Sequence, residues 1–308
     1  MFATPSPHSV AAQAHAALAL RVGLGLVFVI GGLAKLARLL LPSDAAGIVA
    51  QYTGPAGYIN QLFMDWLFAG HLPDVINPWT FLTALSAFEL VSGLMLVAGL
   101  LVRPLALLWA FLLWTFVIAL PVVTTPGVEP GVTTYQSPAL LVQARDVALS
   151  GFFFVLYGLG AGAWSLDHTR FGLPAAHGVD WEIPGLVLRL SLGLVFLVGG
   201  LFHGFSKIPT FDMPAAVLVV VGLGLVSGVA VRVVAAAAAL ALVVFLAGKL
   251  GDAAGPLGYV NSVKRELALL AAAGVLAVLG ADRGYTVRAL GLAARDGARA
   301  YGRGVHRA

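Results

Sequence analysis

Long apolar segments recur along the chain, and they constrain the fold more than any other feature. A helix of about 20 apolar residues spans the roughly 30 Å hydrocarbon core of a bilayer. Hydrophobic residues make up 60% of the 308 residues and charged residues only 10%, far from the make-up of a soluble domain. We therefore expect an all-α integral membrane protein with eight transmembrane helices. The expected helices cover residues 16–37, 79–101, 105–120, 138–161, 183–205, 214–231, 233–248 and 262–279.

An internal repeat divides these helices into two sets. Residues 21–35 recur as residues 189–203, with nine identities in fifteen positions, and the charged pair at 145–146 matches the pair at 265–266. Each unit has an even number of helices, so both units cross in the same direction, as parallel repeats do. We therefore expect two parallel four-helix bundles. The two units are residues 16–167 and 183–281.

Polar segments flank the units: an N-terminal segment (1–15), a hinge (168–182) and a tail (282–308). The tail carries six arginines against two aspartates, and the first fifteen residues contain no Lys or Arg. The positive-inside rule places the tail in the cytoplasm, and eight crossings place the N-terminus there too. The pattern of a cleaved signal peptide is absent. We expect a multi-pass protein of the cell (inner) membrane with both termini cytoplasmic.

The connection at residues 43–78 contains an aromatic, amphipathic stretch. Such a stretch is more typical of a segment lying in the membrane interface than of one crossing it. It could also cover a site that faces the lipid.

Ionisable residues inside the first unit are candidates for the functional site. Each costs about 2.5–3.5 kcal/mol on insertion scales, so those that persist usually face the bundle interior and pair. Helix geometry places Lys35, Glu89, Arg145 and Asp146 together in the outer half of the first unit. They form either a structural ion network or a site whose excess donors bind an anion or a quinone carbonyl.

The second unit carries a different set of polar residues at corresponding heights. The set consists of His203, Lys207, Arg265 and Glu266, and Leu218 replaces Glu89. Two equivalent pockets are therefore not expected. We expect function near Lys35, with the second copy chiefly as scaffold.

The sequence limits which redox groups the chain itself can hold. It has no cysteine, and His203 is the one histidine of seven in a helix expected to cross. A b-type haem needs two facing histidines and an iron–sulfur cluster needs thiolates. We expect no haem, metal or iron–sulfur cluster on this chain.

Several motifs together resemble the DoxX/DoxD family. The resemblance covers residues 16–167 well and 184–290 more loosely. The matching positions are Arg21, Gly25, Phe28, Gly32 and Lys35 in the first helix, Glu89, Gly93, Gly99 and Arg103 in the second, and Arg145, Asp146, Gly160, Gly162, Ser165, Leu166 and Asp167 in and after the fourth.

The resemblance implies a four-helix membrane bundle and a set of activities. The DoxD branch is the membrane subunit of thiosulfate:quinone oxidoreductase, which oxidises thiosulfate to tetrathionate and passes electrons to quinone. Other DoxX-like proteins are membrane parts of thiol-stress and quinone-related redox systems. This sequence lacks a DoxA-like soluble domain and carries a second DoxX-like unit instead.

We therefore expect a membrane subunit of a quinone-linked oxidoreductase, with the thiosulfate:quinone type as one form of it. Quinone would be the co-substrate, and Glu89 or Asp146 would relay its proton. The bilayer and other subunits would be partners, and nucleic acid would not. The expected binding residues are Lys35, Arg145, His203, Lys207, Arg265 and Glu266.

Two other functions compete with this one. The chain could be a non-catalytic structural or assembly subunit of a larger respiratory or photosynthetic membrane complex. A small-molecule transporter is less favoured, because no pair of Gly/Pro-broken helices occupies matching positions.

Overall fold

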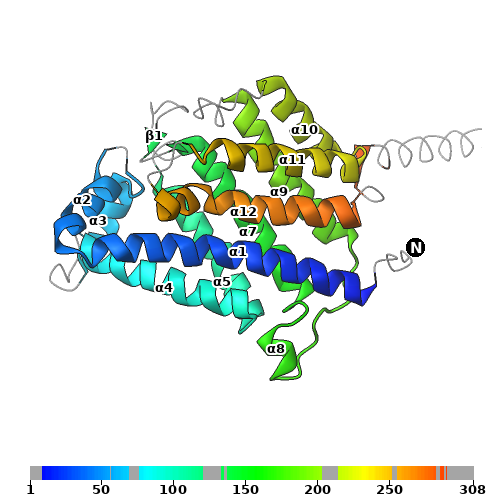
Figure 1. Cartoon of the computed structure of the whole chain (residues 1–308), viewed down its shortest axis with the longest axis horizontal. Coiled ribbons are helices and arrows are strands. Elements are labelled where there is room, and N and C mark those ends of the chain that lie inside the picture. The colour runs from blue at the N-terminus through cyan, green and yellow to red at the C-terminus, as the bar shows by residue number, and fades with distance from the viewer. Residues whose placement is uncertain are drawn as a thin grey trace, which may run out of the picture.

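The protein is described by a computed structural model in which almost all regular structure is α-helical (Figure 1). The described residues are 9–55, 57–68, 76–120, 133–134, 137–202, 214–251, 255–281, 285–287 and 289. The helices are α1 (Val10–Leu39), α2 (Pro42–Thr53), α3 (Gln61–Phe68), α4 (Pro78–Ala98), α5 (Val102–Ala119), α7 (Ala139–Leu159), α8 (Leu166–Thr169), α9 (Glu182–Leu201), α10 (Ala215–Ser227), α11 (Val231–Gly248) and α12 (Gly255–Leu279). The two-residue strands β1 (Thr133–Thr134) and β2 (Ser137–Pro138) pair antiparallel.

Six described helices are long and apolar enough to cross a membrane, namely α1, α4, α5, α7, α9 and α11. They make this a multi-pass membrane protein. The apolar helix α10 has 13 residues, and α12 has three consecutive charged residues at positions 264–266. The expected count of eight crossings is therefore not confirmed.

Glycines bring α1 and α4 into close contact. A Cβ atom on Gly32 would lie 2.6 Å from the Leu90 amide nitrogen and from the Ser86 carbonyl oxygen. Gly25 and Gly93 face each other one to two turns further along the same contact. A larger side chain at these positions would force the helices apart, since small residues are what allows membrane helices to approach closely.

The pair α9 and α10 repeats this contact. Gly193 faces Gly222, and a Cβ atom on Gly200 would lie 2.8 Å from the Ala215 carbonyl oxygen and 3.0 Å from the Val219 amide nitrogen. Positions 193 and 200 lie 168 residues after positions 25 and 32, and positions 215, 219 and 222 lie 129 residues after positions 86, 90 and 93 of the α1–α4 contact. The repeat in the sequence is therefore accompanied by a repeat in the packing.

The repeat places an arginine on α1 and another on α9, and each of them binds the end of a neighbouring helix. The last carbonyls of a helix have no partner within the helix, and cations are favoured there by the helix dipole. Arg21 and Arg189 are both buried and donate to such carbonyls, 3.1 Å to the first acceptor in each case. These acceptors are Leu96 and Val97 for Arg21, and Leu225 and Val226 for Arg189.

Asp167 binds backbone amides at the same end of the first half. Its two carboxylate oxygens accept hydrogen bonds from the backbone amides of Leu101 and Val102, each at 2.9 Å. These amides begin α5 and have no partner inside that helix. Asp167, part of the motif that resembles DoxX/DoxD, therefore stabilises a helix start.

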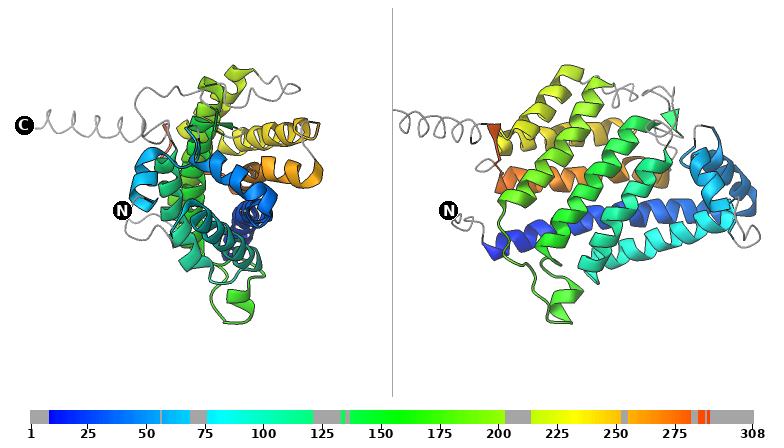
Figure 2. Two further views of the ribbon diagram at one scale, coloured as in Figure 1. Left: turned by 90° about the vertical axis from the view of Figure 1, so that its left-hand side faces the viewer. Right: turned by 180° about the vertical axis from the view of Figure 1, so that it is seen from behind.

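Each half of the chain also packs on the other half. Helix α1 lies along α12, and α7 lies along α9 (Figures 1 and 2), while α1 with α7 and α9 with α12 contact each other less. The first helix of each half therefore packs more on the last helix of the other half than on the last helix of its own half. The expected division into two separate four-helix bundles is not confirmed, because extensive helix contacts also cross between the halves.

The connection between α1 and α4 folds as α2 and α3, which cover one end of the bundle (Figure 1). Its small apolar core consists of Leu39, Ile48, Ile59 and Leu82. The Asn60 side chain donates to the Ile118 carbonyl oxygen at 2.8 Å and so ties this layer to the end of α5. The segment expected to lie in the interface or to cover a site thus covers an end of the helices.

Candidate functional site

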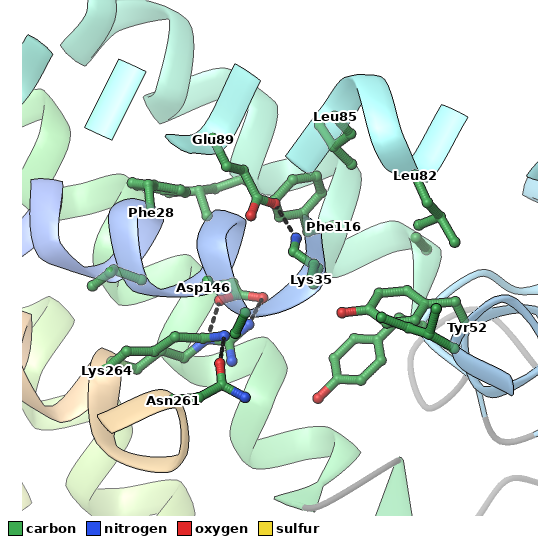
Figure 3. A pocket seen from close by; sticks show the side chains of 18 of the residues that line it. Phe28, Lys35, Tyr52, Leu82, Leu85, Glu89, Phe116, Asp146, Asn261 and Lys264 are labelled. Atoms are coloured by element: carbon green, nitrogen blue, oxygen red, sulfur yellow. Dashed lines mark hydrogen bonds and ion pairs between the residues drawn. The ribbon is translucent and has the colours of Figure 1, made fainter. Parts of the chain in front are cut away.

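A cavity of about 450 Å³ lies beneath this covering layer. It is bounded by α1, α4, α5, α7 and α12, and by residues of α2, α3 and the loop between them. Figure 3 shows the charged groups of the cavity together with the apolar side chains of Phe28, Leu82, Leu85 and Phe116. The cavity therefore suits a ligand with a polar head and an apolar body.

Lys35 and Glu89 form the first ion pair of the cavity. Lys35 is near the end of α1 and its Nζ lies 2.5 Å from Glu89 Oε1, in the middle of α4 (Figure 3). The exposed fractions of the two side chains are 15% and 6%. Glu89 is thus buried in the bundle but open to the cavity.

Two further ion pairs connect α7 of the first half to α12 of the second half. Arg145 pairs with Glu266, and Asp146 accepts from Arg265 Nε at 2.9 Å and from Arg265 Nη2 at 3.4 Å. Because 145–146 and 265–266 are matching positions of the repeat, the pairing is reciprocal. Each arginine binds the acidic residue of the other copy, as across the two-fold axis of a symmetric dimer.

The structure brings six of the eight sequence-predicted site residues into one cavity. The expected cluster in the first half is present, but Arg145 and Asp146 pair with the second half. Arg265 and Glu266 lie in this same cavity, so the second half, expected to serve chiefly as scaffold, supplies part of the cavity wall. His203 and Lys207 lie outside the described residues. The lining members of the predicted set are Lys35, Glu89, Arg145, Asp146, Arg265 and Glu266.

The predicted site residues do not include several polar residues of the cavity, among them Lys264 and Asn261 on α12. Lys264 Nζ donates to Asn261 Oδ1 at 2.7 Å. Their spacing of three residues places them on one helix face, which is the only signal the sequence offers. This face meets α1 at Gly31 because the two halves of the chain pack on each other.

Aromatic side chains shape the two ends of the cavity. Phe28 stacks on the buried Trp109 with ring centroids 3.7 Å apart. At the covering layer, Tyr52 stacks on Tyr58 with centroids 5.2 Å apart, and both line the cavity. Planar rings of this kind pack well against a flat ligand.

Positive charge exceeds negative charge in the lining. The described lining residues include five cations and three carboxylates. They are Lys35, Arg38, Arg145, Lys264 and Arg265, with Glu89, Asp146 and Glu266.

The comparisons with known proteins agree with part of the sequence reading. No curated protein and no solved structure matches the chain significantly. A family model described as DoxX matches residues 16–122. The match includes α1 to α5, with Lys35 and Glu89, and excludes α7 and the second half. Residues 16–122 of this multi-pass membrane protein are thus similar to the DoxX family.

Proposed function

We propose that this chain is the membrane subunit of a quinone-linked oxidoreductase and that the cavity binds the quinone head group. The observation that carries the proposal is the mixed lining of the cavity, which combines three ion pairs with apolar and aromatic side chains. Its volume of about 450 Å³ is in the range of small-molecule sites. The match of residues 16–122 to DoxX, a family associated with such redox systems, supports it.

Glu89 is the better of the two expected proton donors. A quinone supplies, when bound, the acceptor for two electrons and two protons. Asp146 uses both carboxylate oxygens on Arg265, whereas Glu89 contacts Lys35 through Oε1 and has Oε2 near Gly31 at the cavity wall. Glu89 can therefore hold or release a proton toward the cavity without breaking a two-point contact.

The paired cations orient the ligand oxygens in this proposal. Arg145 is held by Glu266 and Arg265 by Asp146, so both guanidinium groups have fixed positions before a ligand enters. Preorganised donors stabilise developing negative charge without reorganising. His203 and Lys207 remain further proposed binding residues.

Several finer features belong to the same proposal. Residues 183–281 would be a second DoxX-like unit, supported by the matching glycine and arginine contacts. The chain would cross the inner membrane eight times with both termini in the cytoplasm. It has no cysteine, so a partner subunit would carry the redox group that oxidises the donor, with thiosulfate as the donor suggested by the DoxD resemblance.

Replacing Glu89 tests the proposed reaction. We expect the Glu89→Gln variant, purified with its partner subunits, to reduce a soluble quinone analogue at least about a hundredfold more slowly, since a positioned acid contributes roughly 10²–10⁴-fold. Binding of the analogue should change little. Glu182→Gln, at the start of α9 and away from the cavity lining, is the matched control.

The outcomes separate the proposal from the structural alternative. If Glu89→Gln retains the wild-type rate, the proton-relay role of Glu89 is excluded. If wild type itself neither binds nor reduces a quinone analogue, while the complex dissociates without this chain, the chain is a structural subunit.

A further inference from the structure

Lys264 is a lining cation that takes no part in the three ion pairs of the cavity, and Arg38, the other such cation, donates to Gln51 Oε1 at 3.2 Å. Lys35, Arg145 and Arg265 each have a carboxylate partner. Among the residues that the structure describes, no carboxylate lies within ion-pair distance of Lys264 Nζ, whose one hydrogen-bond partner there is the Asn261 side chain. An ammonium has three N–H donors, so two remain to be used.

Lys264 is aimed into the cavity by its neighbours. Its Nζ lies beside Gly31, where a Cβ atom would be 3.2 Å away, and Glu89 Oε2 lies 3.6 Å from the same point. Figure 3 shows Lys264, Asn261, Asp146 and the Lys35–Glu89 pair around one space. A charge removed from water is costly unless it is paired, so this position favours an anion.

The internal repeat does not duplicate Lys264 in the first half of the chain. The position that matches Lys264 in the first half is Ala144, and the position that matches Asn261 is Leu141, both buried. Glu89 is likewise matched by the buried Leu218. Lys264 and Asn261 of the second half and Glu89 of the first half are thus each replaced by an apolar residue at the matching place, so these three residues form one such site rather than two equivalent ones.

We propose that Lys264, held by Asn261 beside Gly31, binds an anionic oxygen of the cavity ligand. The cavity then selects amphiphiles with a monoanionic head over neutral ones of the same shape. The inference rests on the proposed function only in taking the cavity as the ligand site. It assigns the charge preference to a residue of the second half.

Two matched ligand pairs test this preference on the full-length protein in lipid nanodiscs. The first is a 2-hydroxy-3-alkyl-1,4-naphthoquinone, anionic at neutral pH, and its neutral 2-methoxy ether. The second is decanoate and its methyl ester, which lack the ring. Wild type should bind the anion of each pair more tightly.

The Lys264→Met variant should remove the preference. We expect the Kd of each anion to rise about tenfold to a hundredfold, as for loss of a hydrogen bond to a charged group, and the Kd of each neutral ligand to change by less than about threefold. Lys264→Arg should retain most of the preference. Lys249→Met is the matched control, because Lys249 bonds the Ser262 carbonyl and does not line the cavity.

Each outcome decides between the two proposals. Naphthoquinones that bind without charge preference overturn the role of Lys264 and leave the quinone site standing. If decanoate binding depends on Lys264 and neither naphthoquinone binds, the role of Lys264 is supported and the quinone site is overturned. An equal loss of binding affinity for the anion and for its ether in Lys264→Met would make the role of Lys264 structural. If Lys264→Met does not fold, absence of any anion preference in wild type and Lys264→Arg still overturns the inference.

Discussion

At the scale of single residues, the buried charges serve two purposes that the sequence does not distinguish. Arg21 and Arg189 bind backbone carbonyls at helix ends, so their role is structural. Arg145 and Arg265 bind carboxylates at the cavity, where they can also meet a ligand. An arginine in an apolar segment is a candidate for either role, and only its neighbours decide.

The Arg145–Glu266 pair should be costly to break from one side. The side chains are 4% and 1% exposed, and removing one partner of a buried pair leaves an uncompensated charge, at a cost of about 3–5 kcal/mol. We expect Glu266→Gln to lower the unfolding temperature of the solubilised protein strongly and Arg145→Met/Glu266→Gln to recover much of the loss. Arg170→Met, on the surface, is the control, and an equal effect of Glu266→Gln and the control would contradict the pair's importance.

At the scale of elements, glycines at matching positions allow two pairs of helices to approach closely. The α1–α4 and α9–α10 contacts use glycines at matching positions, and these were visible in the sequence as a repeat. The sequence does not assign the partner helix, because a small residue allows a close contact without specifying what fills it.

Gly32→Ala should destabilise the α1–α4 contact. The added Cβ would meet backbone atoms of Leu90 and Ser86 at 2.6 Å, and backbone cannot move aside as a side chain can, so we expect a loss of about 1–3 kcal/mol. The control is Gly274→Ala in α12, where no atom lies within 4 Å of the new Cβ and a helix gains stability of roughly 0.5–1 kcal/mol. Thermal unfolding in detergent measures both, and a neutral Gly32→Ala would show that α1 and α4 can separate freely.

At the scale of the whole molecule, the two halves are joined as the two subunits of a dimer are. The α1–α12 and α7–α9 contacts and the reciprocal ion pairs span the boundary. The segment from Arg170 to Pro174 that leads from one half to the other is exposed. The covalent link is therefore not needed to explain the association.

A chain cut within this exposed segment should reassemble. Exposed loops with few contacts tolerate such breaks, so residues 1–172 and 173–308, co-expressed with a tag on one, should co-purify from the membrane. Arg265→Glu should weaken the association, because it places two carboxylates together at Asp146. Arg232→Glu, which does not line the cavity, is the control. Halves that insert stably but do not co-purify would contradict this view.

The sequence by itself determined the class of protein, the helical segments and most of the candidate charges. Length and apolar composition suffice for this, because a helix satisfies its own backbone in lipid. Glu89 and Lys35 were placed together correctly, since both belong to neighbouring helices of one unit.

Only the tertiary structure decided how the two halves share the cavity. Asp146 pairs with Arg265, 119 residues away, and Lys264 lies beside Gly31, because α12 packs on α1 and close to α7. A repeat in the sequence fixes which positions match but not whether each unit packs on itself or on its copy. That choice depends on the contacts between helix faces, because both arrangements would bury the same faces. The arrangement in this structure forms one site from two unequal copies.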